Sequence, residues 1–166
     1  QSAIASPLKG LQDLITALPQ DPVLQLENIA IRQKGEFSNS VLNGDPVEVE
    51  ISFRVRIKTV GLRVYFDLCD EENNILIRSF NDDAAETMSS VEPGRYVSRA
   101  VIPADLLAPR NYELRIYGTI YNQRNIPAGG IGIPLIVEST SGINHAYPQE
   151  PIRAKILARI PWETKL

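Results

Sequence analysis

A strict alternation of apolar and polar side chains from position 47 to position 58 is the feature that most limits how this chain can fold. Its apolar members are Val47, Val49, Ile51, Phe53, Val55 and Ile57. Because successive side chains of a β-strand point to opposite faces, the pattern predicts a strand with one buried and one solvated face. Such a strand needs partner strands and a second layer to cover its apolar side.

Similar patterns predict about eight strands in the whole chain. We expect the others at residues 25–33, 62–69, 75–80, 95–102, 112–121, 133–137 and 154–160. Turn and loop composition predicts connections at 35–46, 81–90, 122–132 and 139–150, and one short helical turn at 104–107. Strands and helices do not alternate as they do in a parallel α/β protein, so we predict an all-β antiparallel β-sandwich.

The first 24 residues differ from the rest. Between Ser6 and Leu18, apolar residues fall on one helical stripe, Ser6-Pro7 is typical of a helix start, and Pro19 ends the pattern. Two interpretations stay open: a short helix that covers one end of the sandwich, or a linker from an upstream domain. We therefore divide the chain into residues 1–24, a linker or short helix, and residues 25–166, the sandwich.

Composition excludes several classes of function. The net charge of -3 argues against a general nucleic-acid or anionic-membrane binder, although it leaves room for a local basic patch. No apolar run approaches the roughly 18 residues of a membrane span. Cys69 is the only cysteine, which favours a reducing compartment. No phosphate-loop or dinucleotide motif occurs, and His145 is the single histidine. We therefore expect no catalytic residues, metal or cofactor; a small carbohydrate-active enzyme would need two carboxylates that converge in a cleft.

The strands at 62–69 and 112–121 carry an unusual mixture on their polar faces. The outward residues are Arg63, Tyr65, Asp67, Arg115, Tyr117, Thr119 and Tyr121. Aromatic rings stack on the apolar faces of sugars, and planar charged groups bind sugar hydroxyls, so the mixture indicates a glycan site. The alternative is an ordinary sheet face, because tyrosine and threonine are good strand formers.

Short motifs give the chain a family resemblance. Pro93-Gly94, Ile102-Pro103, Leu106 or Leu107, and the stretch from Pro109 to Leu114 follow one another as in the C-terminal domain of the Wzt family, although Arg110-Asn111 replaces the usual glycine. The closing Ile160-Pro161-Trp162 is also similar, and the resemblance spans residues 26–162. Wzt proteins are the ATP-binding subunits of O-antigen polysaccharide exporters.

The resemblance implies an immunoglobulin-like sandwich that follows a nucleotide-binding domain and works with a membrane-spanning exporter subunit. It implies recognition of the non-reducing end of a lipid-linked O-antigen polysaccharide, in the cytoplasm at the inner membrane. It also implies a homodimer, with residues 153–160 exchanged as a strand between copies. The alternative is a sandwich module that binds another protein.

For the glycan site, neighbouring positions of the two strands assign roles to the residues. Tyr65 and Tyr117 are expected to be stacking platforms, and Arg63, Arg115 and Asp67 to bind hydroxyls. The rim of the site is expected to comprise Tyr121, Asn122 and Arg124. The polar loop at 81–90 is the second choice.

Overall fold

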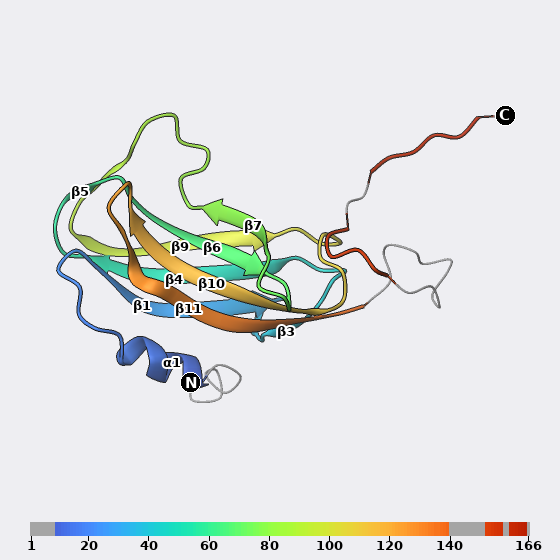
Figure 1. Ribbon diagram of the computed structural model, residues 1–166, viewed down its shortest axis with the longest axis horizontal. Coiled ribbons are helices and arrows are strands. Elements are labelled where there is room, and N and C mark those ends of the chain that lie inside the picture. Colours follow the sequence, from blue (N-terminus) through green and yellow to red (C-terminus); the bar gives the residue numbers. More distant parts are fainter. Residues whose placement is uncertain (1–8, 140–151, 158–159, 166) are drawn as a thin grey trace.

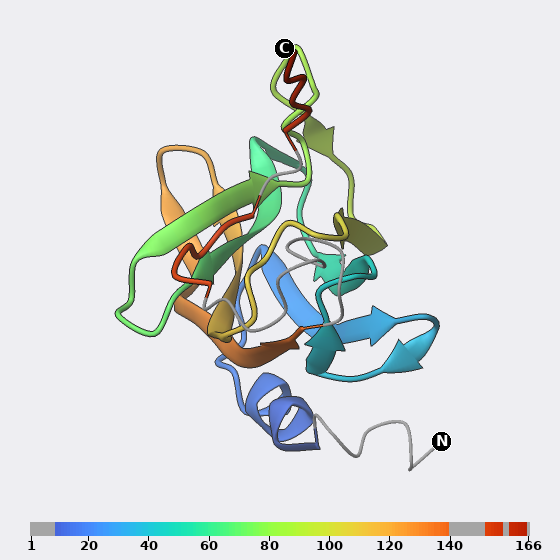
Figure 2. The same ribbon diagram turned by 90° about the vertical axis from the view of Figure 1, so that its right-hand side faces the viewer.

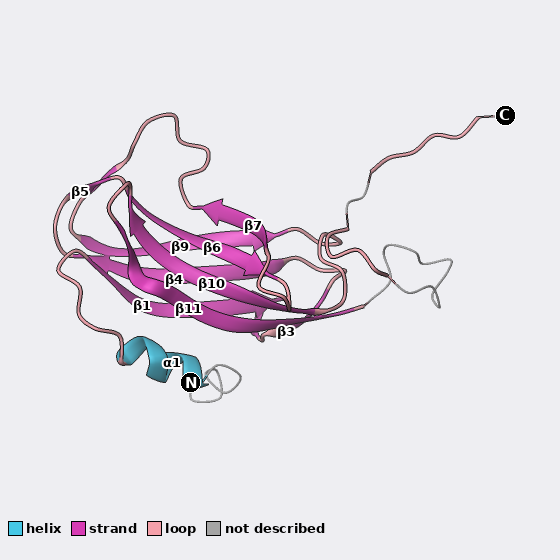
Figure 3. Cartoon of the chain, viewed as in Figure 1, coloured by secondary structure: helices cyan, strands magenta, loops and turns pink. Residues whose placement is uncertain are grey.

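The computed structural model describes residues 9–139, 152–157 and 160–165 and shows two facing β-sheets with one short helix (Figures 1 and 3). The predicted all-β sandwich is therefore confirmed. One sheet has four strands in the order β2-β1-β4-β9, and the other has five in the order β3-β11-β10-β6-β7. A two-stranded ribbon, β5-β8, lies at one end of the molecule.

The four-stranded sheet is built around the alternating segment of the sequence. Its strands are β1 (Leu24–Gln33), β2 (Glu36–Phe37), β4 (Val47–Val55) and β9 (Gly94–Ile102). All five apolar residues of β4 are buried. The strand ends at Val55, however, and Ile57 is 53% exposed, so the last position of the predicted strand is wrong.

The apolar residues of strand β9 do not all face the core. Val97 and Val101 are about 60% exposed, while Ser98 and Ala100 lie opposite the buried Ile51 and Val49 of β4. Since paired residues in a sheet point to the same side, β9 presents its small residues to the core and its valines to solvent.

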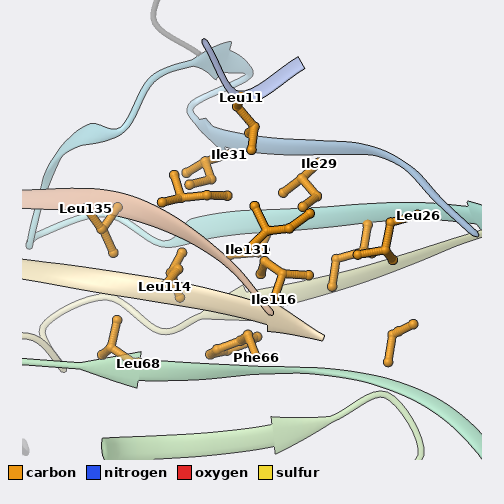
Figure 4. Close-up of a cluster of buried hydrophobic side chains, with 14 of the residues drawn as sticks. Leu11, Leu26, Ile29, Ile31, Phe66, Leu68, Leu114, Ile116, Ile131 and Leu135 are labelled. Atoms are coloured by element: carbon orange, nitrogen blue, oxygen red, sulfur yellow. The ribbon is translucent and has the colours of Figure 1, made fainter. Parts of the chain in front are cut away.

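The five-stranded sheet carries most of the fully buried side chains. Its strands are β3 (Ser40–Leu42), β6 (Leu62–Cys69), β7 (Ile75–Phe80), β10 (Asn111–Ile120) and β11 (Arg124–Glu138). The ribbon consists of β5 (Thr59–Val60) and β8 (Ser90–Val91). Leu68, Leu114 and Leu135 are completely buried from one face of the sheet and belong to the same core cluster as Ile29 and Ile31 of the other sheet (Figure 4).

Helix α1 (Lys9–Thr16) covers one edge of the sandwich. Leu11 and Ile15 are buried in the core cluster, and the helix contacts β1 and β11 (Figure 2). This confirms the helical interpretation of the apolar stripe. Leu11 and Ile15 lie about one helical turn apart, so both point from the helix into the space between the sheets.

Two predicted loops contain strands. The expected connection at 122–132 is a short turn after Tyr121, and β11 begins already at Arg124. Pro127, Gly129 and Gly130, which indicate a loop in the sequence, lie in an irregularity of β11, between the pairs Ile116–Ile131 and Gly118–Ile126. The expected loop at 35–46 likewise contains β2 and β3, which are too short to show a pattern.

Near the C-terminus, two further predictions are wrong. Residues 104–107 form a turn with Asp105 at a φ of 64°, rather than a helical turn. The expected strand at 154–160 is, where described, only a single bridge between Ile156 and Leu107, with Leu157 N donating to Leu106 O (2.6 Å). Most of the expected loop at 139–150, with His145, lies outside the described residues.

Candidate functional site

The structure brings the two strands of the predicted glycan face together. In the pairing of β6 with β10, Tyr65 lies opposite Tyr117, Asp67 opposite Arg115 and Arg63 opposite Thr119. Strand β7 adds two residues that the sequence reasoning missed, Phe80 opposite Tyr65 and Arg78 opposite Asp67. Their strand was predicted, but no signal in so short a strand shows which face they take.

Aromatic rings stand side by side across this face. The Phe80 and Tyr65 ring centroids are 4.5 Å apart, and those of Tyr65 and Tyr117 are 4.8 Å apart with nearly parallel planes. Tyr65 is only 5% exposed, and burial raises the pKa of its hydroxyl above the usual value. Tyr65 is therefore an inner member of the stack, whereas Tyr117 is half-buried.

The charged residues of the face are already paired with one another. Asp67 is buried and accepts two hydrogen bonds from Arg78, from Nε at 2.6 Å and from Nη2 at 2.7 Å. This carboxylate raises the pKa of the Arg78 guanidinium. Arg115 donates to Glu113 (2.6 Å) and to Asn73. These contacts fix the side chains but leave few free hydrogen-bonding groups for a ligand.

A hollow lies at the end of the face, between the 81–90 loop and the turn after β10. We call it the tip cleft; its lining is Arg63, Asp82, Asp83, Ala85, Glu86, Thr87, Met88 and Tyr121, and its volume is about 310 Å³. Tyr121 and Met88 are about half exposed. Gly61 supports both, because a Cβ there would lie 3.0 Å from Tyr121 Cβ and 3.2 Å from Met88 Sδ.

Arg63 joins the tip cleft to the aromatic face. Its guanidinium lies 3.6 Å above the Phe80 ring centroid, and its Nε donates to Asp82 (2.8 Å). The cleft thus combines members of the predicted face, Arg63 and Tyr121, with the loop that was the second choice. The exposed Asn122 follows Tyr121 in the turn, with a φ of 59°.

Two other predicted site residues have different surroundings. The Thr119 hydroxyl donates to the Arg124 carbonyl (3.1 Å). Arg124 pairs with Ile120, which is buried, and its side chain forms an ion pair with Asp21 that holds the Asp21 pKa at about 2. Arg124 therefore lies with the linker between α1 and β1, not on the rim of the tip cleft.

Two features are absent from the described residues, a metal-binding cluster and a membrane-spanning helix. In these ranges, no group of three or more histidine, cysteine or carboxylate side chains is placed to hold a metal ion. Across the same ranges, no helix is long and apolar enough to cross a membrane.

Comparisons with known proteins support the fold. No family model matches the chain, and no curated protein matches its sequence. The crystal structure of the C-terminal domain of Wzt is similar with a TM-score of 0.63 and 11% identity, covering 87% of this chain and 86% of that one.

Two weaker similarities are to the cupredoxin domain of amoB from Nitrosocaldus yellowstonii and to a Niemann-Pick type C2 protein from the Japanese carpenter ant. Their TM-scores are 0.44 and 0.43, with 11% and 10% identity; the matches cover 72% and 73% of this chain and 89% and 97% of those chains. At 11% identity, the similarity to the Wzt C-terminal domain shows a shared fold, which extends over most of both chains.

Proposed function

We propose that this chain is a non-catalytic carbohydrate-binding domain that recognises the non-reducing end of a lipid-linked O-antigen polysaccharide for export by an ABC transporter. The fold it shares with the Wzt C-terminal domain supports the class of function. The observation that carries the proposal is the tip cleft, where a half-exposed tyrosine lies beside Arg63 and three carboxylates in a hollow of about 310 Å³.

The chemistry of the tip cleft suits a sugar. Tyr121 offers an exposed aromatic ring for the apolar face of a pyranose. The carboxylates of Asp83 and Glu86 accept hydrogen bonds from hydroxyl groups, and Arg63 donates them. The volume lies at the lower end of the range of about 300 to 1,000 Å³ that is usual for small-ligand sites, so it suits the end of a chain. Tyr117 and Arg115 extend the site along the sheet.

The remaining parts of the proposal concern the parent protein. Residues 25–166 would be the glycan-binding domain, and residues 1–24 would connect it to an upstream nucleotide-binding domain that associates with a membrane-spanning exporter subunit. The protein would then work in the cytoplasm at the inner membrane. The support for this setting is the shared fold and the motifs that resemble the Wzt family.

Calorimetric titration with the O-polysaccharide of the source strain tests the glycan site. Tyr121→Ala is expected to weaken binding about fivefold or more, because one stacked ring contributes on the order of 1 kcal/mol. Glu86→Gln should weaken it less. Phe37→Ala, which removes a half-buried ring from the other sheet, is the control and should leave affinity unchanged.

Tyr117→Ala and Arg115→Ala locate the site more finely. If they weaken binding and Tyr121→Ala does not, the glycan lies on the aromatic face instead of the tip cleft. Wild-type affinity in all these variants would contradict both placements, and absence of any binding by the wild-type protein would contradict the proposed function.

We further propose a homodimer in which the C-terminal segment reaches a second copy. Ile160 and Trp162 support this, because they are 66% and 89% exposed on a ribbon that extends away from the sandwich (Figure 1). Exchange of such a segment is a low-cost route to a dimer. Light scattering should give a dimer for the wild type and mostly monomer for an Ile160→Ser, Trp162→Ala double variant. A wild-type monomer at micromolar concentration would contradict the dimer.

A further inference from the structure

Two arginines face each other on the outer side of the four-stranded sheet. Arg54 of β4 lies directly opposite Arg95 of β9, and both side chains are exposed. Like charges in directly opposite positions destabilise a sheet. Such a pair is therefore unfavourable in the isolated fold, and an anionic partner would relieve the repulsion.

The nearby charges compensate this pair only in part. Arg95 contacts Glu27 at 3.3 Å, and Lys58 contacts Glu92 at 3.3 Å, in both cases with largely exposed basic side chains. Arg54 forms no ion pair within the described part of the chain. Exposed ion pairs of this kind contribute little stability, so their basic partners are available to another anion.

At the other end of the same sheet face, the basic side chains are fully neutralised by carboxylates. There Arg32 and Arg99 each contact both Glu48 and Glu50, at distances between 2.7 and 3.3 Å. Two positive and two negative charges therefore balance within one network. The excess of positive charge is confined to the end that carries Arg54 and Arg95.

Exposed aliphatic side chains lie next to Arg95 on β9 and in the segment that follows Arg54. Val97 lies two residues from Arg95 on the same face and is 60% exposed. Ile57 and Val60, in the segment that leaves β4, are 53% and 58% exposed. Isolated exposed apolar residues are common. Here Val97 lies beside unbalanced positive charge and the segment after Arg54 adds two more, so this end of the molecule is both basic and apolar.

We propose that this surface docks on an anionic lipid bilayer. The docking patch consists of Arg54, Ile57, Lys58, Val60, Arg95 and Val97. Guanidinium groups bind phosphate strongly, and aliphatic side chains enter the boundary between headgroups and acyl chains, so the patch matches such a surface in both respects. A free phosphate ion would leave the apolar part unused.

Charges elsewhere determine how the molecule would lie. The carboxylates of the tip cleft, Asp82, Asp83 and Glu86, belong to the loop that precedes β8, next to the five-stranded sheet, and an anionic surface repels them. The outer face of the four-stranded sheet therefore turns toward the bilayer. The tip cleft, which adjoins Val60 through the pairing of β5 with β8, lies at the margin of the contact. The proposal needs no glycan and stands apart from the proposed function.

Vesicle co-sedimentation tests the docking patch with the full chain. At low salt, the protein should bind phosphatidylcholine vesicles that contain about 40 mol% phosphatidylglycerol, but not pure phosphatidylcholine vesicles, and about 0.5 M salt should abolish binding. Each neutralised basic residue is expected to weaken binding about fivefold, so Arg54→Gln with Arg95→Gln should weaken it about 25-fold. Ile57→Ser with Val60→Ser should weaken binding without changing its salt dependence.

The control is Lys34→Gln with Lys165→Gln, which removes the same charge from two exposed lysines outside the patch. It should bind vesicles like the wild type. Absence of wild-type binding to the anionic vesicles, or an equal loss in the control, would overturn the proposal. Binding to polyglutamate or inorganic phosphate but not to vesicles would also overturn it, by assigning the arginine pair to an acidic protein or a soluble anion. Thermal melts confirm that each variant is folded.

Discussion

Arg78→Ala is expected to lower the free energy of unfolding by about 3 kcal/mol, although Arg78 lies on an edge strand and its side chain is 47% exposed. The reason is its partner: the Asp67 side chain is only 2% exposed, and Arg78 holds it with two short hydrogen bonds. Without the guanidinium, a carboxylate stays buried with no ion-pair partner. Denaturation in urea measures the loss.

A second substitution identifies the cause. When Asp67→Asn is combined with Arg78→Ala, no buried charge remains, and part of the lost stability should return. The matched control is Arg110→Ala, which removes another arginine from an ion pair, that with Glu71 at 3.0 Å. Because Glu71 is exposed, this change should cost less than about 1 kcal/mol. Equal losses for Arg78→Ala and Arg110→Ala would contradict the account.

The sequence predicts the strands of the core well because their alternation records burial directly. In β4, β6 and β10, the residues expected to point inward are buried within the strand bounds. In β9, alternation alone does not identify the buried face. There the valines face solvent, while Ser98 and Ala100 lie opposite the buried Ile51 and Val49. At an edge strand, the geometry of the neighbouring sheet outweighs hydrophobicity.

The candidate site could be predicted only in part. The sequence indicates that Tyr65, Tyr117, Asp67 and Arg115 share a face, and the strand pairing confirms it. It does not indicate that β7 covers Tyr65 and Asp67, since that depends on the register of a short strand. The sequence does not show the tip cleft either. The cleft forms where the 81–90 loop meets Tyr121, which is 31 positions from the last residue of that loop.

Glycine positions next to the aromatic stack lead to the second large effect. Gly130 has a φ of 71°, and a Cβ there would lie 2.7 Å from carbons of the Tyr117 ring. Gly129, its neighbour in the same irregular part of β11, has no positive φ, and a Cβ there would have nothing within 4 Å. Substituting each glycine in turn therefore distinguishes a specific requirement for glycine at position 130 from a general effect of losing a glycine in this segment.

Gly130→Val is expected to lower the free energy of unfolding by about 3 kcal/mol. A β-branched residue is strained at this φ by about 1 to 2 kcal/mol, and displacing the Tyr117 ring adds a cost of similar size. Gly129→Val should change stability by less than about 1 kcal/mol, because an exposed strand position accepts valine. If the glycan extends from the tip cleft onto Tyr117, only the Gly130 variant loses affinity for the polysaccharide. Equal melting temperatures for the two variants would show that Tyr117 can move aside freely, and that the aromatic stack is not the fixed platform its geometry indicates.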